Sequence, residues 1–218
     1  MHFEALVEDQ SGARAVELFL EKILGPNGKD HSYRIHPYKG LGRLPKNLRD
    51  IKKPYKRILL DRLPALLRGY GKSLQPDQCV LVVVDLDDRD CIAFKSQLLG
   101  ILEGFEPKPR ALFRIAIEEI EAWLLGDQDA VKKAYPKSKD TVLKQYVQDD
   151  ICGTWEKLAD AVNPGGSLDL KKCGYPDIGA AKREWAEKIV PLCNIDKNQS
   201  KSFQVFRDGV LRLAGVKD

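Results

Sequence analysis

The sequence lacks most of the short motifs by which enzyme classes are recognised. It contains no G-x-S-x-G, no G-x-x-x-x-G-K-[ST] and no G-x-G-x-x-G, which argues against a hydrolase nucleophile elbow, a P-loop and a dinucleotide-binding turn. Its five cysteines are widely scattered without a C-x-x-C pair, so we expect neither a zinc knuckle nor a disulfide framework. The three histidines show no ligand spacing, and we expect structural roles for them, although His36 stands near the glycine-rich turn and could reach a site there.

Long apolar runs are also missing. No stretch approaches the roughly 20 residues that span a bilayer, and the chain begins Met-His-Phe-Glu, without a basic segment followed by an apolar one. We therefore expect a cytoplasmic protein without membrane contact. The 218 residues are 43% hydrophobic and 31% charged, which suits a soluble protein with a sizeable core. The net charge of +4 argues neither for nor against nucleic acid as a partner.

Apolar runs alternate with helical patterns in the first part of the chain, which is typical of parallel α/β sheets. Residues 80–84 form a nearly uninterrupted β-branched run, which predicts a central strand covered on both faces. We predict a mostly parallel four-stranded sheet flanked by helices. The expected strands are 2–8, 32–38, 80–84 and 111–117, and the expected helices are 12–24, 46–70 and 91–102, with Pro54 and Pro64 bending or breaking the second.

Beyond about residue 128 the pattern changes, and no strand is expected. Pro and Gly separate the segments there. We therefore expect an α/β domain over residues 1–127 and a C-terminal helical extension over 128–218 packed on it. The helical segments expected in that extension are 138–148, 154–162, 178–190 and 202–214.

Acidic residues follow three of the four expected strands. The carboxyl ends of parallel strands share one edge of a sheet, so these side chains can converge there. Carboxylate oxygens are the ligands that Mg²⁺ and Mn²⁺ prefer. The acids are Glu8 after the first strand, Asp85, Asp87 and Asp88 after the third, and Glu118, Glu119 and Glu121 after the fourth.

Each acid also has an ordinary structural explanation. Asp at a strand end is often a helix cap or turn residue, and acids in a first helical turn are favoured by the helix dipole. If a helix begins near Glu118, then Glu118 and Glu121 share a face while Glu119 diverges. We therefore rank Glu121 first as a ligand, then Glu118, then Glu119. Asp9 and Ser11 can cap the helix that follows the first strand.

A basic segment follows the second expected strand. From Lys39 to Lys72 there are eleven Lys or Arg residues against two acids. Lys39, Arg43, Lys46 and Arg49 lie nearest the acids and are candidates to bind nucleic-acid phosphates, and the glycines beside them would allow a close approach. A solvated helix face explains the run equally well. Further basic residues that could extend such a surface are Lys171, Lys172, Lys182 and Arg183.

Several longer motifs resemble those of known families. A strand ending in Glu, followed by a later strand ending in Asp-x-Asp, is the layout of the TOPRIM domain of topoisomerases, primases and the overcoming-lysogenization-defect nucleases. More specifically, the chain resembles a bacterial TOPRIM-like family labelled domain of unknown function 4276. The matching segments are HPYKG at 36–40, DLDD at 85–88, IEEIEAWLL at 117–125, AKREWA at 181–186 and SKSF at 200–203.

Relatives of that family include the nuclease-like subunit of the PARIS phage-defence system and, more distantly, the RloB proteins. The resemblance implies that Glu8 is the TOPRIM glutamate and that Asp85 and Asp87 are metal ligands. Glu121 then corresponds to the Glu that stands two residues before Trp. TOPRIM domains usually carry Gly directly after the first Glu, whereas this chain has Asp9, which either extends the acidic cluster or alters the Glu8 backbone.

We therefore expect a Mg²⁺- or Mn²⁺-dependent nuclease that acts on DNA or tRNA in anti-phage defence. Glu8 would be general base or bridging ligand, and the other acids would hold the ion or ions, while Lys39 and Arg43 hold a phosphate. The alternative is a non-catalytic TOPRIM-like subunit that docks on an ATPase partner. A phosphatase or nucleotide hydrolase with the same metal site is a third interpretation, and the number of subunits stays open. The expected ligands are Glu8, Asp85, Asp87, Asp88, Glu121 and Glu118.

Overall fold

The computed structural model describes residues 1–45 and 57–216. The strands are β1 (His2–Val7), β2 (Ser32–Pro37), β3 (Gln78–Asp85) and β4 (Ala111–Ala116). The helices of the first part are α1 (Gln10–Leu24), α2 (Leu59–Ser73), α3 (Cys91–Leu102) and α4 (Glu121–Leu125). Those that follow are α5 (Gln128–Ala134), α6 (Asp140–Lys144), α7 (Thr154–Val162), α8 (Gly166–Cys173), α9 (Tyr175–Ile189), the 3₁₀ turn η1 (Val190–Leu192) and α10 (Lys201–Ala214).

All four strands run parallel in a single sheet. Their order is β2-β1-β3-β4, so that β1 and β3 lie in the middle. Residues 80–84 of β3 are buried, because helices cover both faces of the sheet. The predicted α/β class, with a mostly parallel four-stranded sheet flanked by helices, is therefore confirmed, and the arrangement is consistent with a TOPRIM-like fold.

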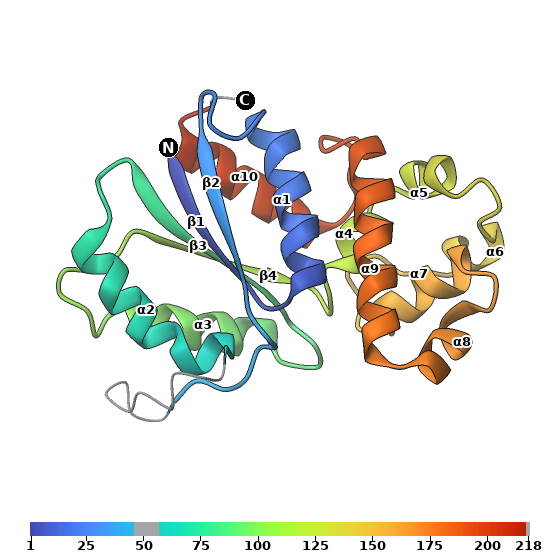
Figure 1. Ribbon diagram of the computed structural model, residues 1–218, viewed down its shortest axis with the longest axis horizontal. Coiled ribbons are helices and arrows are strands. Elements are labelled where there is room, and N and C mark those ends of the chain that lie inside the picture. Colours follow the sequence, from blue (N-terminus) through green and yellow to red (C-terminus); the bar gives the residue numbers. More distant parts are fainter. Residues whose placement is uncertain (46–56, 217–218) are drawn as a thin grey trace.

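Two hydrophobic cores lie on the two faces of the sheet. Val80, Val82 and Val84 pack with α2 and α3, whereas Leu81 and Val83 pack with α1 and α10, as the two-residue side-chain period of a strand requires. Figure 1 shows α2 and α3 on one side of the sheet and α1 and α10 on the other. The sheet therefore has one helical layer on each face.

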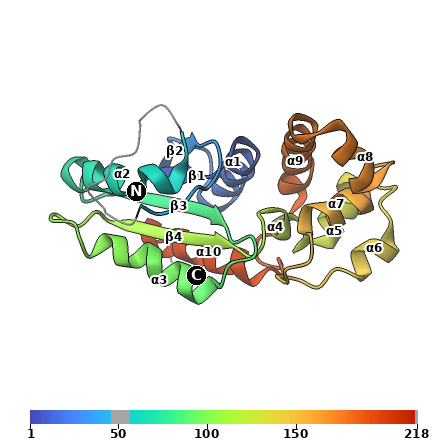
Figure 2. The same ribbon diagram turned by 90° about the horizontal axis from the view of Figure 1, so that it is seen from below.

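The helices after α4 fall into two places. Helices α5 to α9 gather beyond one end of the sheet (Figures 1 and 2), with α9 alongside α1. Helix α10 returns to the sheet and packs beside β4. A C-terminal helical extension is present as predicted, and its last helix is part of the layer that covers the sheet.

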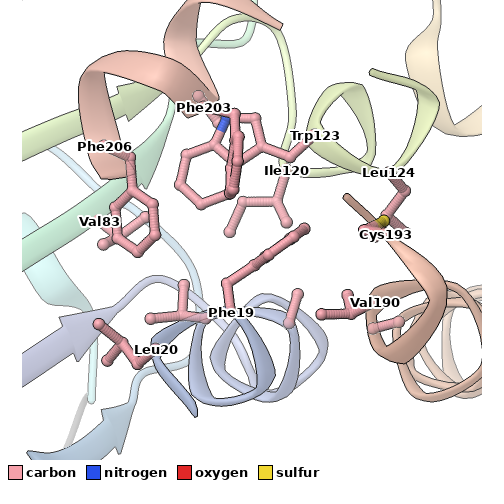
Figure 3. Close-up of a cluster of buried hydrophobic side chains, with 14 of the residues drawn as sticks. Phe19, Leu20, Val83, Ile120, Trp123, Leu124, Val190, Cys193, Phe203 and Phe206 are labelled. Carbon is pink, nitrogen blue, oxygen red and sulfur yellow. The ribbon is translucent and has the colours of Figure 1, made fainter. Parts of the chain in front are cut away.

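An aromatic cluster joins α10 to α4 and α1. The Trp123 ring lies 4.7 Å from that of Phe206 and 5.8 Å from that of Phe203, measured between centroids, and Phe19 completes the group (Figure 3). The Trp123 indole N–H donates a hydrogen bond to the Ser202 hydroxyl at 2.9 Å. This cluster fixes α4, which carries the predicted site acid Glu121, against the sheet.

Some elements differ from the expected ones. Helix α2 continues through Pro64, since one proline removes a single backbone hydrogen bond while Leu63 and Leu67 still anchor the helix in the core. The expected helix start at residue 46, and Pro54, lie outside the described residues. The sequence pattern also does not predict the short helices α5 and α8.

Among the described helices, we find none with the length and apolar character needed to cross a bilayer.

Candidate acidic cleft at the strand ends

A cleft of about 500 Å³ opens at the carboxyl ends of the central strands. One wall carries acids that follow β1, β3 and β4, and the facing wall comes from α7, α8 and α9. A larger cavity of about 600 Å³ lies around Asp127 and Lys133 and contains none of the strand-end acids. The residues that matter in the acidic cleft are Glu8, Asp9, Asp85, Asp87, Glu119, Trp155, Lys171, Tyr175 and Lys182.

Glu8 and Asp85 lie side by side at the carboxyl ends of the two central strands. The Asp85 backbone N–H donates to Glu8 Oε2 at 3.4 Å, and Asp85 Oδ1 accepts from the Ile120 N–H at 3.0 Å. Burial and then the charge of Asp87 raise the pKa of Glu8 to about 7. Burial and then Glu8 raise the pKa of Asp85 well above its ordinary value. Burial and the neighbouring acids thus disfavour the ionised forms of both carboxyl groups, and a cation beside them would favour those forms.

Asp87 and Asp88 lie in the turn after β3 and behave differently. Asp87 has a φ of 51° and lines the cleft, where its Oδ2 accepts from Arg89 Nη1 at 2.5 Å. Left-handed backbone is uncommon for residues other than Gly, and Asp is one of the few that adopt it more often. Asp88 is exposed and is not one of the residues that line the cleft. The predicted pair Asp85 and Asp87 therefore faces one cleft, while Asp88 does not join them.

Glu119 and Glu121 close around a lysine from the distant helix α9. Lys182 Nζ lies 3.2 Å from Glu119 Oε1 and 3.1 Å from Glu121 Oε2, and 5.9 Å from the centre of the Trp155 ring. Burial alone would lower the pKa of Lys182, but Glu121, Glu119 and Asp85 together raise it. Burial and then Glu121 raise the pKa of Glu119 to about 8. The sequence analysis ranks Glu121 first and Glu119 last as ligands, yet Glu119 lines the cleft and Glu121 is buried without lining it.

Glu118 turns away from the cleft. Its carboxylate accepts hydrogen bonds from the backbone N–H groups of Cys152, Gly153 and Thr154 at 3.2, 2.8 and 2.8 Å, so it caps α7. The prediction that Glu118 and Glu121 share one helical face is wrong. Helix α4 begins only at Glu121, and Glu118 precedes it with a φ of 56°, so the three-residue helical spacing does not apply to this pair.

Asp9 caps α1, as predicted. Its Oδ1 accepts from the Gly12 N–H at 2.7 Å, and its carboxylate also accepts from the Ser11 hydroxyl at 3.0 and 3.1 Å. An added Cβ at Gly12 would stand 3.0 Å from the Ile120 side chain, so the glycine permits α1 to start close to the loop between β4 and α4. Asp9 also lines the cleft and thus adds to its acidic wall.

The lysines of the cleft belong to the set expected to extend the binding surface, not to the set expected nearest the acids. Lys46 and Arg49 lie outside the described residues. Lys39 and Arg43 are both described by the structure. They are exposed, and neither lines the cleft. The backbone N–H of Gly40 does donate to the Glu8 carbonyl at 3.0 Å, so this glycine turn lies against the site. The lysines that line the cleft are Lys171 of α8 and Lys182 of α9.

The donor chemistry of the cleft fits a hard divalent cation. Glu8, Asp85 and Asp87 offer carboxylate oxygens only. Burial and then the neighbouring acids raise the pKa values of Glu8 and Asp85, and a cation would oppose both effects. In residues 1–45 and 57–216, however, no three Asp, Glu, His or Cys side chains are already gathered as a metal shell. Binding an ion would therefore require these carboxylates to turn toward one another.

Fold and site together define the class: a parallel α/β protein with a carboxylate-lined cleft at the ends of its central strands. The chain belongs to the family described as Domain of unknown function (DUF4276), whose model matches residues 7–211. The matched region includes every strand-end acid and Lys182. No curated protein and no solved structure matches the chain.

Proposed function

We propose that this protein is a Mg²⁺- or Mn²⁺-dependent nuclease that hydrolyses phosphodiester bonds in DNA or RNA, in bacterial anti-phage defence. The observation that carries the proposal is the pairing of Glu8 and Asp85. They stand at the ends of adjacent parallel strands, and both have raised pKa values. A TOPRIM relationship, with the PARIS nuclease-like subunit among its relatives, is part of the proposal and rests on the same order of acids.

The acids have distinct roles in this proposal. Glu8, Asp85 and Asp87 would hold the ion, which when bound supplies charge stabilisation at a phosphoryl group and a more acidic water. Without an ion, burial and then the charge of Asp87 raise the pKa of Glu8 to about 7, and a bound cation would favour its ionised form. Glu118, which caps α7, and the exposed Asp88 have no part in it.

The wall that faces the acids suits a polynucleotide. Lys171 Nζ lies 5.5 Å from the centre of the Trp155 ring and 3.0 Å from Glu156, and the Tyr175 side chain at the cleft is 88% exposed. Aromatic rings beside lysines are the combination on which unpaired bases stack while the backbone phosphates meet positive charge. This favours nucleic acid over a free nucleotide as the substrate.

Cleavage assays with matched variants test the proposal. Purified protein is incubated with Mg²⁺ or Mn²⁺ and with single- and double-stranded DNA, RNA and tRNA, alone and with an ATPase encoded beside its gene. We expect cleavage that Glu8→Gln and Asp85→Asn each reduce by about 100-fold or more. Asp88→Asn is the control, because it changes an acid in the same turn that lies outside the cleft, and it should retain activity.

Two outcomes would replace the proposal. If every nucleic acid stays intact in all these mixtures, the protein is a non-catalytic subunit that docks on an ATPase. If nucleotides are hydrolysed and oligonucleotides are not, the site belongs to a phosphatase or nucleotide hydrolase. Equal activity of Asp85→Asn and wild type would also place the chemistry elsewhere.

A further inference from the structure

The acids of the cleft, together with the buried Glu121 beside it, form two groups with different surroundings. Glu119 and Glu121 contact Lys182 at 3.2 and 3.1 Å. Glu8 and Asp85 meet only backbone N–H donors among the hydrogen bonds of the described residues, at 3.4 and 3.0 Å. The first group thus already has a cation between its carboxylates. In the second group Arg89 pairs with Asp87 at 2.5 Å, and no ion pair of the described residues involves Glu8 or Asp85.

Lys182 is built into the site. Only 12% of its side chain is exposed, against 19% for Glu119 and 6% for Glu121. The Trp155 ring, 5.9 Å from Nζ, adds a further favourable contact for a cation. Removing one partner from a buried ion pair leaves an uncompensated charge, which is strongly unfavourable. Moving the Lys182 ammonium out of this position would therefore cost free energy.

The position of Lys182 restricts which cations can enter. Sites with two metal ions hold them about 3.5 to 4 Å apart, bridged by shared carboxylates. Asp85 is the acid that both groups share, since its charge interacts with Glu8 on one side and with Glu121 and Lys182 on the other. A second divalent ion beside Glu119 and Glu121 would lie against the Lys182 ammonium, and like charges in a site of low dielectric repel strongly.

We propose that Lys182 takes the place of a second metal ion, so that the cleft holds a single divalent ion, at Glu8, Asp85 and Asp87. This inference rests on the proposed metal dependence of the protein and adds how many ions take part. Lys182 is a positioning residue in this scheme, because it fixes Glu119 and Glu121 and keeps a further ion away from them.

Counting bound Mn²⁺ by isothermal titration calorimetry and by the electron paramagnetic resonance signal of free Mn²⁺ tests the inference without using activity. We expect wild-type protein to bind a single Mn²⁺ per chain. Lys182→Met keeps the length of the side chain and removes its charge, so this variant should bind a second Mn²⁺. Lys182→Arg keeps the charge and should bind one.

Lys171→Met is the matched control. It removes another lysine of the same cleft, one that pairs with Glu156 at 3.0 Å, and it should leave the count at one. If Lys182→Met does not fold, as judged by circular dichroism, the double variant Glu119→Gln/Glu121→Gln replaces it. That variant should still bind one Mn²⁺ with wild-type affinity, because the ion lies on the other group of acids.

The outcomes separate this inference from the proposed function. Two Mn²⁺ ions in a wild-type protein that cleaves nucleic acid would overturn the inference and leave the nuclease standing. A Lys182→Met variant that folds and binds one ion, or a double variant that loses its ion, would overturn it as well. Wild-type protein that binds no Mn²⁺ would overturn both.

Discussion

Glu118 and Thr154 are 36 residues apart in the chain, and the carboxylate of the first caps the helix that begins at the second. The Thr154 N–H donates to Glu118 Oε2 at 2.8 Å, and the Thr154 hydroxyl donates to the same oxygen. Gly153, at the usual capping position, has no side chain to serve there. An acid of the strand-end cluster is thereby used to attach the helical part of the protein to the sheet.

We expect Glu118→Ala to lower the free energy of unfolding by about 1 to 2 kcal/mol, the usual effect of removing a helix cap, while Mn²⁺ binding is retained. Urea denaturation and calorimetric titration measure the two effects. Asp88→Ala, an exposed acid of a neighbouring turn, should change stability by less than about 0.5 kcal/mol. Loss of Mn²⁺ binding in Glu118→Ala at unchanged stability would show that the capping role is wrong.

The stability of the metal-free protein should fall as the pH rises toward neutrality. Burial, and then the charge of Asp87, raise the pKa of Glu8 to about 7, whereas an unfolded chain has a Glu pKa of about 4.3. A carboxyl with a raised folded pKa stabilises the protein below its unfolded pKa, and this contribution is lost as the pH rises through about 7.

Thermal melting from pH 4 to 8 in the presence of a chelator tests this pH dependence. Glu8→Gln should show a smaller fall in Tm across that range than wild type, and Mn²⁺ should restore the Tm of wild type at pH 8. Identical pH profiles for the two proteins would contradict the burial of an ionisable Glu8 in the cleft.

The aromatic cluster should be a main source of stability. The Trp123 ring packs against Phe203, Phe206 and Phe19 and is fully buried. Trp123→Ala should cost about 3 to 5 kcal/mol of unfolding free energy, as large-to-small changes in a core do, and Trp123→Phe should cost less. Chemical denaturation with far-ultraviolet circular dichroism provides both values. A loss below 1 kcal/mol in Trp123→Ala would contradict this packing.

The fragment 1–127 should not fold by itself. Without α10, the sheet face that Phe203, Phe206 and Val210 cover would be open to water, and burying that apolar surface is the main favourable contribution to folding. We expect the fragment to show no cooperative thermal transition, whereas the full chain does. A cooperative transition with the Tm of the full chain would establish residues 1–127 as an independent domain.

Tyr175 should contribute to nucleic-acid binding without affecting the fold, because its side chain is 88% exposed at the cleft. Losing one stacked base costs about 1 to 3 kcal/mol, so Tyr175→Ala should weaken binding of single-stranded DNA by about 5- to 150-fold at unchanged Tm. Fluorescence anisotropy measures the affinity. Leu168→Ala changes a residue that is 70% exposed outside the cleft and should bind as wild type does. Equal affinities of Tyr175→Ala and Leu168→Ala would show that nucleic acid binds elsewhere on the surface.

Local patterns predict the elements where neighbours in the chain decide the structure. The helices at 91–102 and 154–162 begin and end where the sequence indicates, because capping residues, glycines and apolar spacing mark their ends. The prediction is less accurate around Glu118, where a left-handed residue delays α4 until Glu121. That conformation depends on contacts with α7, which no nearby residue reveals.

Among the site residues, Glu8, Asp85 and Asp87 are predictable because they directly follow buried strands. Lys182 is a different case. It lies 63 residues after Glu119, its partner at the cleft. The sequence suggests Lys182 only as one of four basic residues that could extend a binding surface, so its ion pairs with Glu119 and Glu121 become known only from the packing of α9.

The amino-acid sequence by itself determined the parallel α/β class and the placement of acids at one edge of the sheet, since strand burial and strand direction follow from local hydrophobic patterns. Only the tertiary structure decided which acids share a cleft, which one caps a helix and which cation they already hold. The physical reason is that these choices depend on contacts between elements far apart in the chain, and such contacts form only when the helices after residue 127 pack against the sheet.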